Sequence, residues 1–188
     1  MPVVTELLQQ TGTSMADLDE VVVGLGPGPF TGLRVGIASA QMLALANRID
    51  WMGVCGLDVL AAQFLLGDRD DAGRPYPGEF VVAIDARRKE LYWARFSVVG
   101  ERIGPPEVSA AAALPDLPVT GPGVGVYTDV LGDRVRAGPQ TVDAAVLAAW
   151  CFPAVGTEPL YLRRPDATVA TRHKSALPRV LPRRAGDR

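Results

Sequence analysis

The sequence is poor in the residues on which thiol and metal chemistry depend. It contains one histidine, His173, and two cysteines, Cys55 and Cys151, which stand far apart. Such a pair forms neither a disulfide framework nor a zinc site, so we expect reduced thiols. A Ser-His-Asp or Cys-His catalytic unit needs an ordered histidine, and His173 lies in a basic segment near the C-terminus. The composition therefore argues against a hydrolase built on either unit.

The chain also lacks the apolar runs and the leader pattern of membrane and secreted proteins. No apolar stretch approaches the roughly 20 residues of a membrane-spanning helix, and residues 1–6 do not resemble a signal peptide. We expect a soluble, cytoplasmic protein with no membrane partner. Apolar residues make up 48% of the 188 residues, which is enough to bury a core in one domain or two small ones.

The standard nucleotide fingerprints are missing from the glycine-rich stretch Gly24–Gly36. It lacks the Gly-Lys-Ser/Thr ending of a P-loop, and its first glycines are spaced too closely for a dinucleotide fingerprint. The stretch follows an apolar strand and leads into a predicted helix at 31–46. This order suits either an anion site at a helix N-terminus or a rigid corner with Thr31 as N-cap. The phosphate-loop-like residues of this turn are Gly26, Gly28, Thr31 and Gly32.

The predicted helix at 31–46 carries a stripe of small side chains. Its members recur every four residues, so another backbone can approach closely along that side. The stripe consists of Gly32, Gly36, Ala40 and Ala44. Leu33, Ile37 and Leu43 flank it, which is typical of a helix buried in its own fold or across an interface. Arg34 opposes the helix dipole in the first turn; an anionic neighbour would explain it, and so would simple solvation.

Helices and strands alternate along the rest of the chain, which favours an α/β sheet. Helices are predicted at 2–11, 57–66 and 143–152, and strands at 20–25, 52–55, 79–86, 91–99 and 101–108, with a capping box at Ser14–Asp17. Composition divides the chain into residues 1–67, a polar linker at 68–78, a second part at 79–162 and a basic, disordered tail at 163–188. The tail has eight basic against two acidic residues, so it either contacts nucleic acid or an acidic partner, or it stays solvated.

The tight turn predicted at 87–90 follows Asp85, which ends a strand. Asp85 could act as a catalytic or magnesium-binding carboxylate, or it could cap the hairpin. The cations of the turn, Arg87 among them, could touch a phosphate or remain solvated.

Four blocks of this sequence resemble the TsaB family, the partner subunits of the bacterial machinery that makes threonylcarbamoyladenosine on tRNA. The most specific block is ADLDEVVVGLGPGPFTGLRVG at residues 16–36. The others are Gly53–Asp58, Asp85–Ala94 and Pro159–Asp166, in the expected order. Together they cover the chain from residue 2 to residue 166.

The resemblance implies an actin-like, Hsp70-like ATPase fold with two lobes and a lost catalytic site. TsaB-like proteins pair with TsaD, the catalytic paralogue, and a small ATPase, TsaE, joins the pair; contact with tRNA is then indirect. The family's pairing surface involves helices of the N-terminal lobe. Carried over to this chain, the partner interface comprises Val4, Leu7, Leu8, Leu33, Arg34, Gly36, Ile37 and Ala40.

The sequence departs from the family pattern at two places. Family members begin with a hairpin that bears Asp-Thr-Ser/Thr, whereas here Met1 stands where the first helix should start, so we expect an incomplete N-terminal lobe. The second turn reads Asp-Ala-Arg and lacks the glycine of a working phosphate loop, which makes Asp85 and Arg87 a degenerate second loop. Both departures agree with a non-catalytic subunit without a cofactor or a metal.

The leading hypothesis is therefore a non-enzymatic subunit that supports threonylcarbamoylation of the adenosine next to the tRNA anticodon. It would pair with a TsaD-like transferase and could form a homodimer when alone. One alternative is a stand-alone actin-like ATPase or kinase. Another is a glycoprotease-like peptidase, which the single histidine disfavours.

Overall fold

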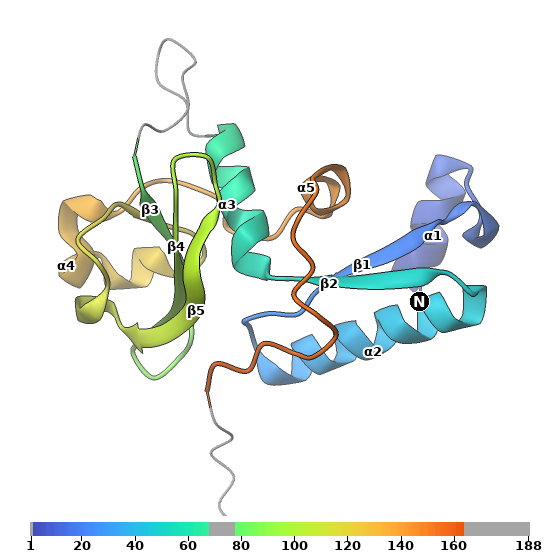
Figure 1. The fold of residues 1–188 in the computed structure, drawn as a ribbon, viewed down its shortest axis with the longest axis horizontal. Coiled ribbons are helices and arrows are strands. Elements are labelled where there is room, and N and C mark those ends of the chain that lie inside the picture. Colours follow the sequence, from blue (N-terminus) through green and yellow to red (C-terminus); the bar gives the residue numbers. More distant parts are fainter. Residues whose placement is uncertain (1, 68–77, 164–188) are drawn as a thin grey trace, which may run out of the picture.

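The computed structural model describes residues 2–67 and 78–163, and it contains two β-sheets on either side of one helix, α3 (Gly56–Gly67) (Figure 1). The first sheet has two parallel strands, β1 (Glu20–Gly24) and β2 (Asp50–Val54). The second has four strands in the order β5-β4-β3-β6. We call the first sheet with its helices the first lobe and the second sheet with its helices the second lobe.

The first lobe is built from a strand-helix-strand unit. Its helix, α2 (Phe30–Asn47), runs below the strands in Figure 1, while α1 (Pro2–Thr11) rises above them. Because β1 and β2 are parallel, α2 is the crossover that joins them, as expected for an α/β unit. Ile37 and Ala44 are the buried residues of α2. The helices predicted at 2–11 and 31–46 are confirmed, as is the capping box, in which Asp17 accepts hydrogen bonds from the backbone and the hydroxyl of Ser14.

The second lobe is a mixed sheet with both faces covered. Its strands are β3 (Phe80–Asp85), β4 (Glu90–Phe96), β5 (Arg102–Ala110) and β6 (Val119–Thr120). The β3–β4 and β4–β5 pairs are antiparallel, and the β3–β6 pair is parallel. The three strands predicted between residues 79 and 108 are thus confirmed.

Alternate residues of β3 belong to two separate cores, as the two-residue period of a strand requires. Phe80 and Val82 pack with α3, where the ring centroid of Phe80 lies 4.8 Å from that of Phe64. Val81 and Ala83 pack on the other face with the segment that follows β5. That segment holds the short helices η2 (Ala111–Ala113), η3 (Val124–Tyr127), α4 (Thr128–Leu131) and η4 (Gly132–Arg134).

The last helix, α5 (Ala144–Ala149), is shorter than the helix predicted at 143–152. Asp143 is its N-cap and accepts a hydrogen bond from the backbone N–H of Ala145 at 2.7 Å. The predicted helix extends too far at its C-terminal end, because Trp150 already adopts an extended backbone. Pro153 also disfavours a helical conformation at the residue before it.

Residues 153–163, which we call the strap, tie the two lobes together. The backbone N–H of Val155 donates to Gly53 and that of Leu160 donates to Leu25, both in the first lobe. At its end, Arg163 donates to the carbonyl of Ala86 and forms an ion pair with Glu90 in the second lobe. The predicted disorder is therefore wrong for Arg163, whose partners are too remote in sequence to be predicted from local patterns. Residues 164–188 and most of the predicted linker lie outside the described residues.

A glycine lets the strap pass close to β2. A Cβ atom on Gly53 would lie 2.6 Å from the carbonyl oxygen of Gly156, which is closer than real Cβ atoms approach oxygen. Within residues 2–67 and 78–163, none of the helices is both long enough and apolar enough to cross a bilayer.

Candidate functional site

The glycine-rich turn between β1 and α2 is packed into the junction of the two lobes. The backbone N–H of Leu25 donates to Val54, and the carbonyl of Gly26 accepts from Gly56 at the start of α3. Leu25 and Gly26 are buried. The turn thus fixes the direction in which α2 leaves the sheet, which corresponds to the rigid corner considered from the sequence.

The N-cap of α2 differs from the prediction. The helix begins at Phe30 with Pro29 in the N-cap position, and no side chain caps it. Thr31 is already helical, so the prediction of Thr31 as N-cap was wrong. Proline suits this boundary because its fixed φ is compatible with the start of a helix and it has no N–H to satisfy.

Arg34 is held by two aromatic rings at the N-terminal end of α2. Its guanidinium carbon lies 3.7 Å from the centre of the Phe30 ring, and its Nε donates to the Tyr161 hydroxyl at 2.9 Å. The Phe30 and Tyr161 rings are 5.2 Å apart. These cation–π contacts stabilise the Arg34 guanidinium and so help to offset the unfavourable helix dipole, whereas an anionic neighbour from a partner or a phosphate stays a prediction. The sequence could not reveal this cluster because Tyr161 comes from the strap, 127 positions away.

One face of α2 exposes large apolar side chains. Val35, Met42 and Leu45 are 62%, 60% and 72% exposed. Their spacing of seven and three residues brings them onto one side of the helix. Arg, aromatic and Met side chains are enriched at protein interfaces, and the Arg34 cluster lies on the same helix. We call Val35, Met42 and Leu45 the outer face of α2.

The predicted interface residues do not all share this exposure. Ile37 is a buried residue of α2, and Leu33 and Ala40 are half-buried. Gly36 and Arg34 are exposed. The small-residue stripe is likewise divided, because Gly32 and Gly36 face open space whereas Ala44 is 1% exposed. The stripe of small residues did not predict the outer face. The available signal was the pair of apolar residues Val35 and Met42, which stand one heptad apart.

The first helix, α1, adds further exposed apolar residues. Val3 and Leu7 are exposed, while Val4 and Leu8, one position further along, are half-buried. Of the predicted interface residues on this helix, Leu7 is therefore available for contact, and Val4 and Leu8 are turned partly inward. The interface assignment itself remains a prediction.

The second candidate loop is a capped hairpin turn. The Asp85 Oδ1 atom accepts from the backbone N–H of Arg87 and from the hydroxyl of Tyr127, each at 3.1 Å. The pKa of Tyr127 is raised by desolvation and by this hydrogen bond to Asp85. The Arg87 side chain is 87% exposed and lies 3.7 Å from the same carboxylate. Asp85 therefore caps the hairpin. That Asp85 and Arg87 form a degenerate phosphate loop stays a prediction.

Close approach of a second glycine-rich loop encloses Asp85. A Cβ atom on Gly123 would lie 2.6 Å from the Cβ of Asp85, and Gly123 has a φ of +90°. Only glycine suits a position that combines this crowding with a left-handed backbone.

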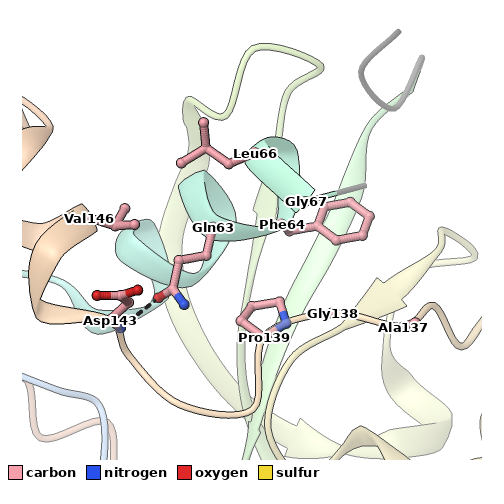
Figure 2. A pocket seen from close by; sticks show the side chains of 9 residues that line it. All are labelled: Gln63, Phe64, Leu66, Gly67, Ala137, Gly138, Pro139, Asp143 and Val146. Carbon is pink, nitrogen blue, oxygen red and sulfur yellow. Dashed lines mark hydrogen bonds between the residues drawn. The ribbon is translucent and has the colours of Figure 1, made fainter. Parts of the chain in front are cut away.

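A pocket of about 500 Å³ lies between α3, α5 and residues 137–139. Figure 2 shows Gln63 and Asp143 facing each other in it, and Gln63 Oε1 accepts from the backbone N–H of Asp143 at 3.0 Å. Gln63 also donates to the carbonyl of Thr141. Its amide thus connects α3 to the segment before α5. None of the site residues predicted from the sequence lines this pocket.

The two cysteines lie in contrasting surroundings. Cys55 is buried at the start of α3, and desolvation, with a smaller contribution from Asp58, raises the pKa of its thiol to about 11. Cys151 is exposed. Among the described residues, no three His, Cys, Asp or Glu side chains are grouped so that they could hold a metal ion; His173 lies outside those residues.

Comparison with known proteins identifies relatives connected with tRNA threonylcarbamoyladenosine biosynthesis. A family model described as TsaD, tRNA N6-adenosine threonylcarbamoyltransferase, matches residues 1–146. An uncharacterized protein of Mycobacterium tuberculosis is 41% identical over 171 residues, which cover 88% of this chain and 74% of that protein. The tRNA threonylcarbamoyladenosine biosynthesis protein TsaB of Escherichia coli is 38% identical over 96 residues, which cover 51% of this chain and 38% of that protein.

Two solved structures from Pseudomonas aeruginosa are similar in fold. One, an uncharacterized protein with similarity to peptidase YeaZ, aligns with a TM-score of 0.64 and 30% identity over 86% of this chain and 82% of its own. The other, YeaZ, aligns with a TM-score of 0.63 and 28% identity over 79% and 72% of the two chains.

Proposed function

Because the chain belongs to the TsaD family and, within it, to the TsaB proteins, we propose that it is a non-catalytic subunit that pairs with a TsaD-like transferase. In this role it supports threonylcarbamoylation of the adenosine next to the tRNA anticodon. The TsaB relatives carry the broader assignment to tRNA threonylcarbamoyladenosine biosynthesis. The expected actin-like α/β fold of two lobes agrees with the family model and with the YeaZ structures.

The exposed outer face of α2 carries the proposal of a partner subunit. Three large apolar side chains project from one helix face, and burying such a side chain contributes about 1.5–3 kcal/mol. The family resemblance points to the same helix as the pairing element. A TsaD-like subunit that covers Val35, Met42 and Leu45 would remove this apolar surface from water.

The Arg34 cluster gives this surface a fixed polar anchor. Phe30 and Tyr161 hold the guanidinium at one end of α2, so little side-chain freedom is lost when a partner binds. Arg and Tyr are common among residues that dominate binding energy. A TsaE-like ATPase would join through the assembled pair, and tRNA would be contacted indirectly.

The strap supports a scaffold rather than a hinged enzyme. It bonds to Gly53 and Leu25 in the first lobe and to Ala86 and Glu90 in the second. Enzymes that close around a ligand use a few backbone positions as a hinge between their moving parts. A strap with partners on both sides resists such a hinge motion.

Co-purification with a TsaD-like subunit tests the pairing. Val35→Arg puts a charge into the proposed interface, and we expect it to abolish co-purification or weaken it by more than tenfold. Val126→Arg is the matched control, because Val126 is also an exposed valine, at 77% against 62% for Val35, and it lies in η3 of the second lobe. Ile37→Arg is unsuitable, since it would bury a charge within the first lobe.

Two outcomes decide against the proposal. Unchanged pairing of the Val35→Arg and Met42→Arg variants would exclude the outer face of α2 as the interface. Binding and turnover of Mg-ATP by the isolated chain, measured by calorimetry and phosphate release, would instead favour a stand-alone ATPase. A reconstituted tRNA modification assay should lose activity when this chain is left out.

A further inference from the structure

A second cavity, of about 590 Å³, lies where α3 meets the turn between β4 and β5 and the segment that follows α5. Its walls include Leu65 from α3, Val99 from the turn, and Trp150 and Phe152 from the segment. The volume falls within the range of about 300–1,000 Å³ that small-molecule sites occupy. None of the predicted interface or phosphate-loop residues lines it.

Asp58 places a buried carboxylate in this apolar setting. Its side chain is 6% exposed and lines the cavity from the first turn of α3. Arg102 approaches with Nε at 2.8 Å from Oδ1. Arg102 thus serves Oδ1 as an ion-pair partner, whereas Oδ2 has no hydrogen-bond donor among the residues that the structure describes. A buried acceptor left without a donor is costly, by about 1–3 kcal/mol or more when charged.

The surroundings of the carboxylate define what could satisfy it. The charged groups that line the cavity are Asp58, Glu101 and Arg102, so acidic groups exceed basic ones by one. Desolvation raises the pKa of Asp58, and Arg102 only partly opposes the rise. A donor of positive or partial positive charge beside Oδ2 would relieve this imbalance.

We propose that this cavity is a binding site for a small molecule with a flat apolar body and an ammonium or N–H donor group. The donor group hydrogen-bonds to the Asp58 carboxylate, while the body packs against Leu65, Phe152 and the ring of Trp150. A flat ring system suits walls that contain two aromatic side chains. The inference does not depend on the proposed pairing function, because the site is separate from the outer face of α2.

The test uses 1-naphthylmethylamine, which has a flat body and an ammonium group, and 1-naphthylacetate as a matched probe with a carboxylate. Titration of the full chain is followed by amide and indole N–H chemical shifts. We expect saturable shifts at Gly100, Arg102 and the Trp150 indole with the amine, and binding of the carboxylate at least about tenfold weaker. No saturable shift with the amine, or equal binding of the two probes, overturns the proposal.

Variants assign the binding to the cavity. Asp58→Asn keeps the shape of the side chain, and we expect it to weaken amine binding about tenfold or more. Asp116→Asn is the control, because the Asp116 side chain is fully exposed and does not line the cavity. If Asp58→Asn fails to fold, Trp150→Ala removes a wall and leaves the carboxylate in place; amine affinity unchanged in Trp150→Ala overturns the proposal.

Discussion

The two lobes differ in how completely they bury their apolar residues. In the second lobe, one core packs β3 and β4 against α3 and a second core covers the opposite face. In the first lobe, the fully buried apolar residues are few, among them Leu25, Ile37, Ala44 and Val54, and large apolar side chains remain exposed on α1 and α2. The second lobe also exposes large apolar side chains, among them Val99 and Val126, but they lie on a turn and on a short helix. Those of the first lobe gather on two longer helices, which offer a more continuous apolar surface for another molecule to cover.

The two candidate loops differ in backbone strain. The turn before α2 is rich in glycine and is held by backbone hydrogen bonds to the start of α3. The turn after Asp85 instead places Arg87, Arg88 and Lys89 in the left-handed region, with φ values of 64°, 56° and 63°. Left-handed backbone costs a non-glycine residue roughly 1–2 kcal/mol. The second loop thus stores strain that the first avoids.

The largest effect is expected from the core of the second lobe. Phe80→Ala leaves a cavity between Phe64 and Phe96, and we expect the free energy of unfolding to fall by about 3–5 kcal/mol. Val35→Ala in the exposed first-lobe helix should change it by less than about 0.5 kcal/mol. Urea denaturation of both variants measures the difference. Similar losses in the two would contradict the contrast between the lobes.

The next effect concerns the buried ion pair beside α3. Arg102→Met leaves the Asp58 carboxylate unpaired, and we expect a loss of about 3 kcal/mol near neutral pH. Without Arg102, the folded-state pKa of Asp58 rises further above its unfolded value. Between the two pKa values of Asp58, the folded variant holds a proton that the unfolded variant releases. The folding stability of Arg102→Met is therefore fully present below the unfolded pKa of Asp58 and is lost as pH rises through its folded pKa.

The gap between Arg102→Met and the parent chain should therefore widen with increasing pH. Denaturation at several pH values between acidic and neutral measures it. Arg87→Met is the control, because Arg87 is 87% exposed and its ion pair contributes little. A gap that stays constant with pH would show that Asp58 does not carry the effect.

A smaller effect is expected at the strap. Arg163→Ala removes its hydrogen bond to Ala86 and its ion pair with the partly exposed Glu90, and we expect a loss of about 1 kcal/mol. Amide hydrogen exchange should quicken at Leu160, which donates to Leu25, while Val81, which donates to Pro118 in the second lobe, keeps its rate. Equal protection of Leu160 in both proteins would mean that Arg163 does not fasten the strap.

The smallest effect tests the strained loop. Lys89→Gly should stabilise the chain by up to about 1 kcal/mol, because glycine adopts a φ of 63° without steric penalty. Lys89→Ala keeps the penalty and serves as the matched variant, since it also removes the charge. Thermal denaturation compares the two. If alanine stabilises as much as glycine, charge rather than backbone strain dominates this turn.

Local patterns predicted most of the helices and strands correctly. The apolar run before Gly24, the capping box at Ser14–Asp17 and the alternation along 79–108 each depend on neighbours within a few residues. Boundaries failed where distant contacts intervene. The helix predicted to end at 152 ends at Ala149, where the following segment turns to line the cavity beside α3.

The candidate site was less accessible to sequence reasoning. The sequence predicted the helix that carries the site, but the stripe of small residues did not point to Val35, Met42 and Leu45. Which side of an all-round apolar helix faces outward depends on where the strands lie, and they cover Ile37 and Ala44. The Arg34–Tyr161 and Asp58–Arg102 contacts join residues far apart in the chain and leave no local signal.

The sequence by itself determined the order of helices and strands, the glycine-rich corner and the family resemblance, because each resides in short-range residue patterns. Only the tertiary structure decided which face of α2 is exposed, that residues 153–163 fasten both lobes, and that a carboxylate lies buried beside a cavity. Those features arise from packing between segments that are remote along the chain, where hydrogen bonding and burial depend on the position of the whole fold rather than on neighbouring residues.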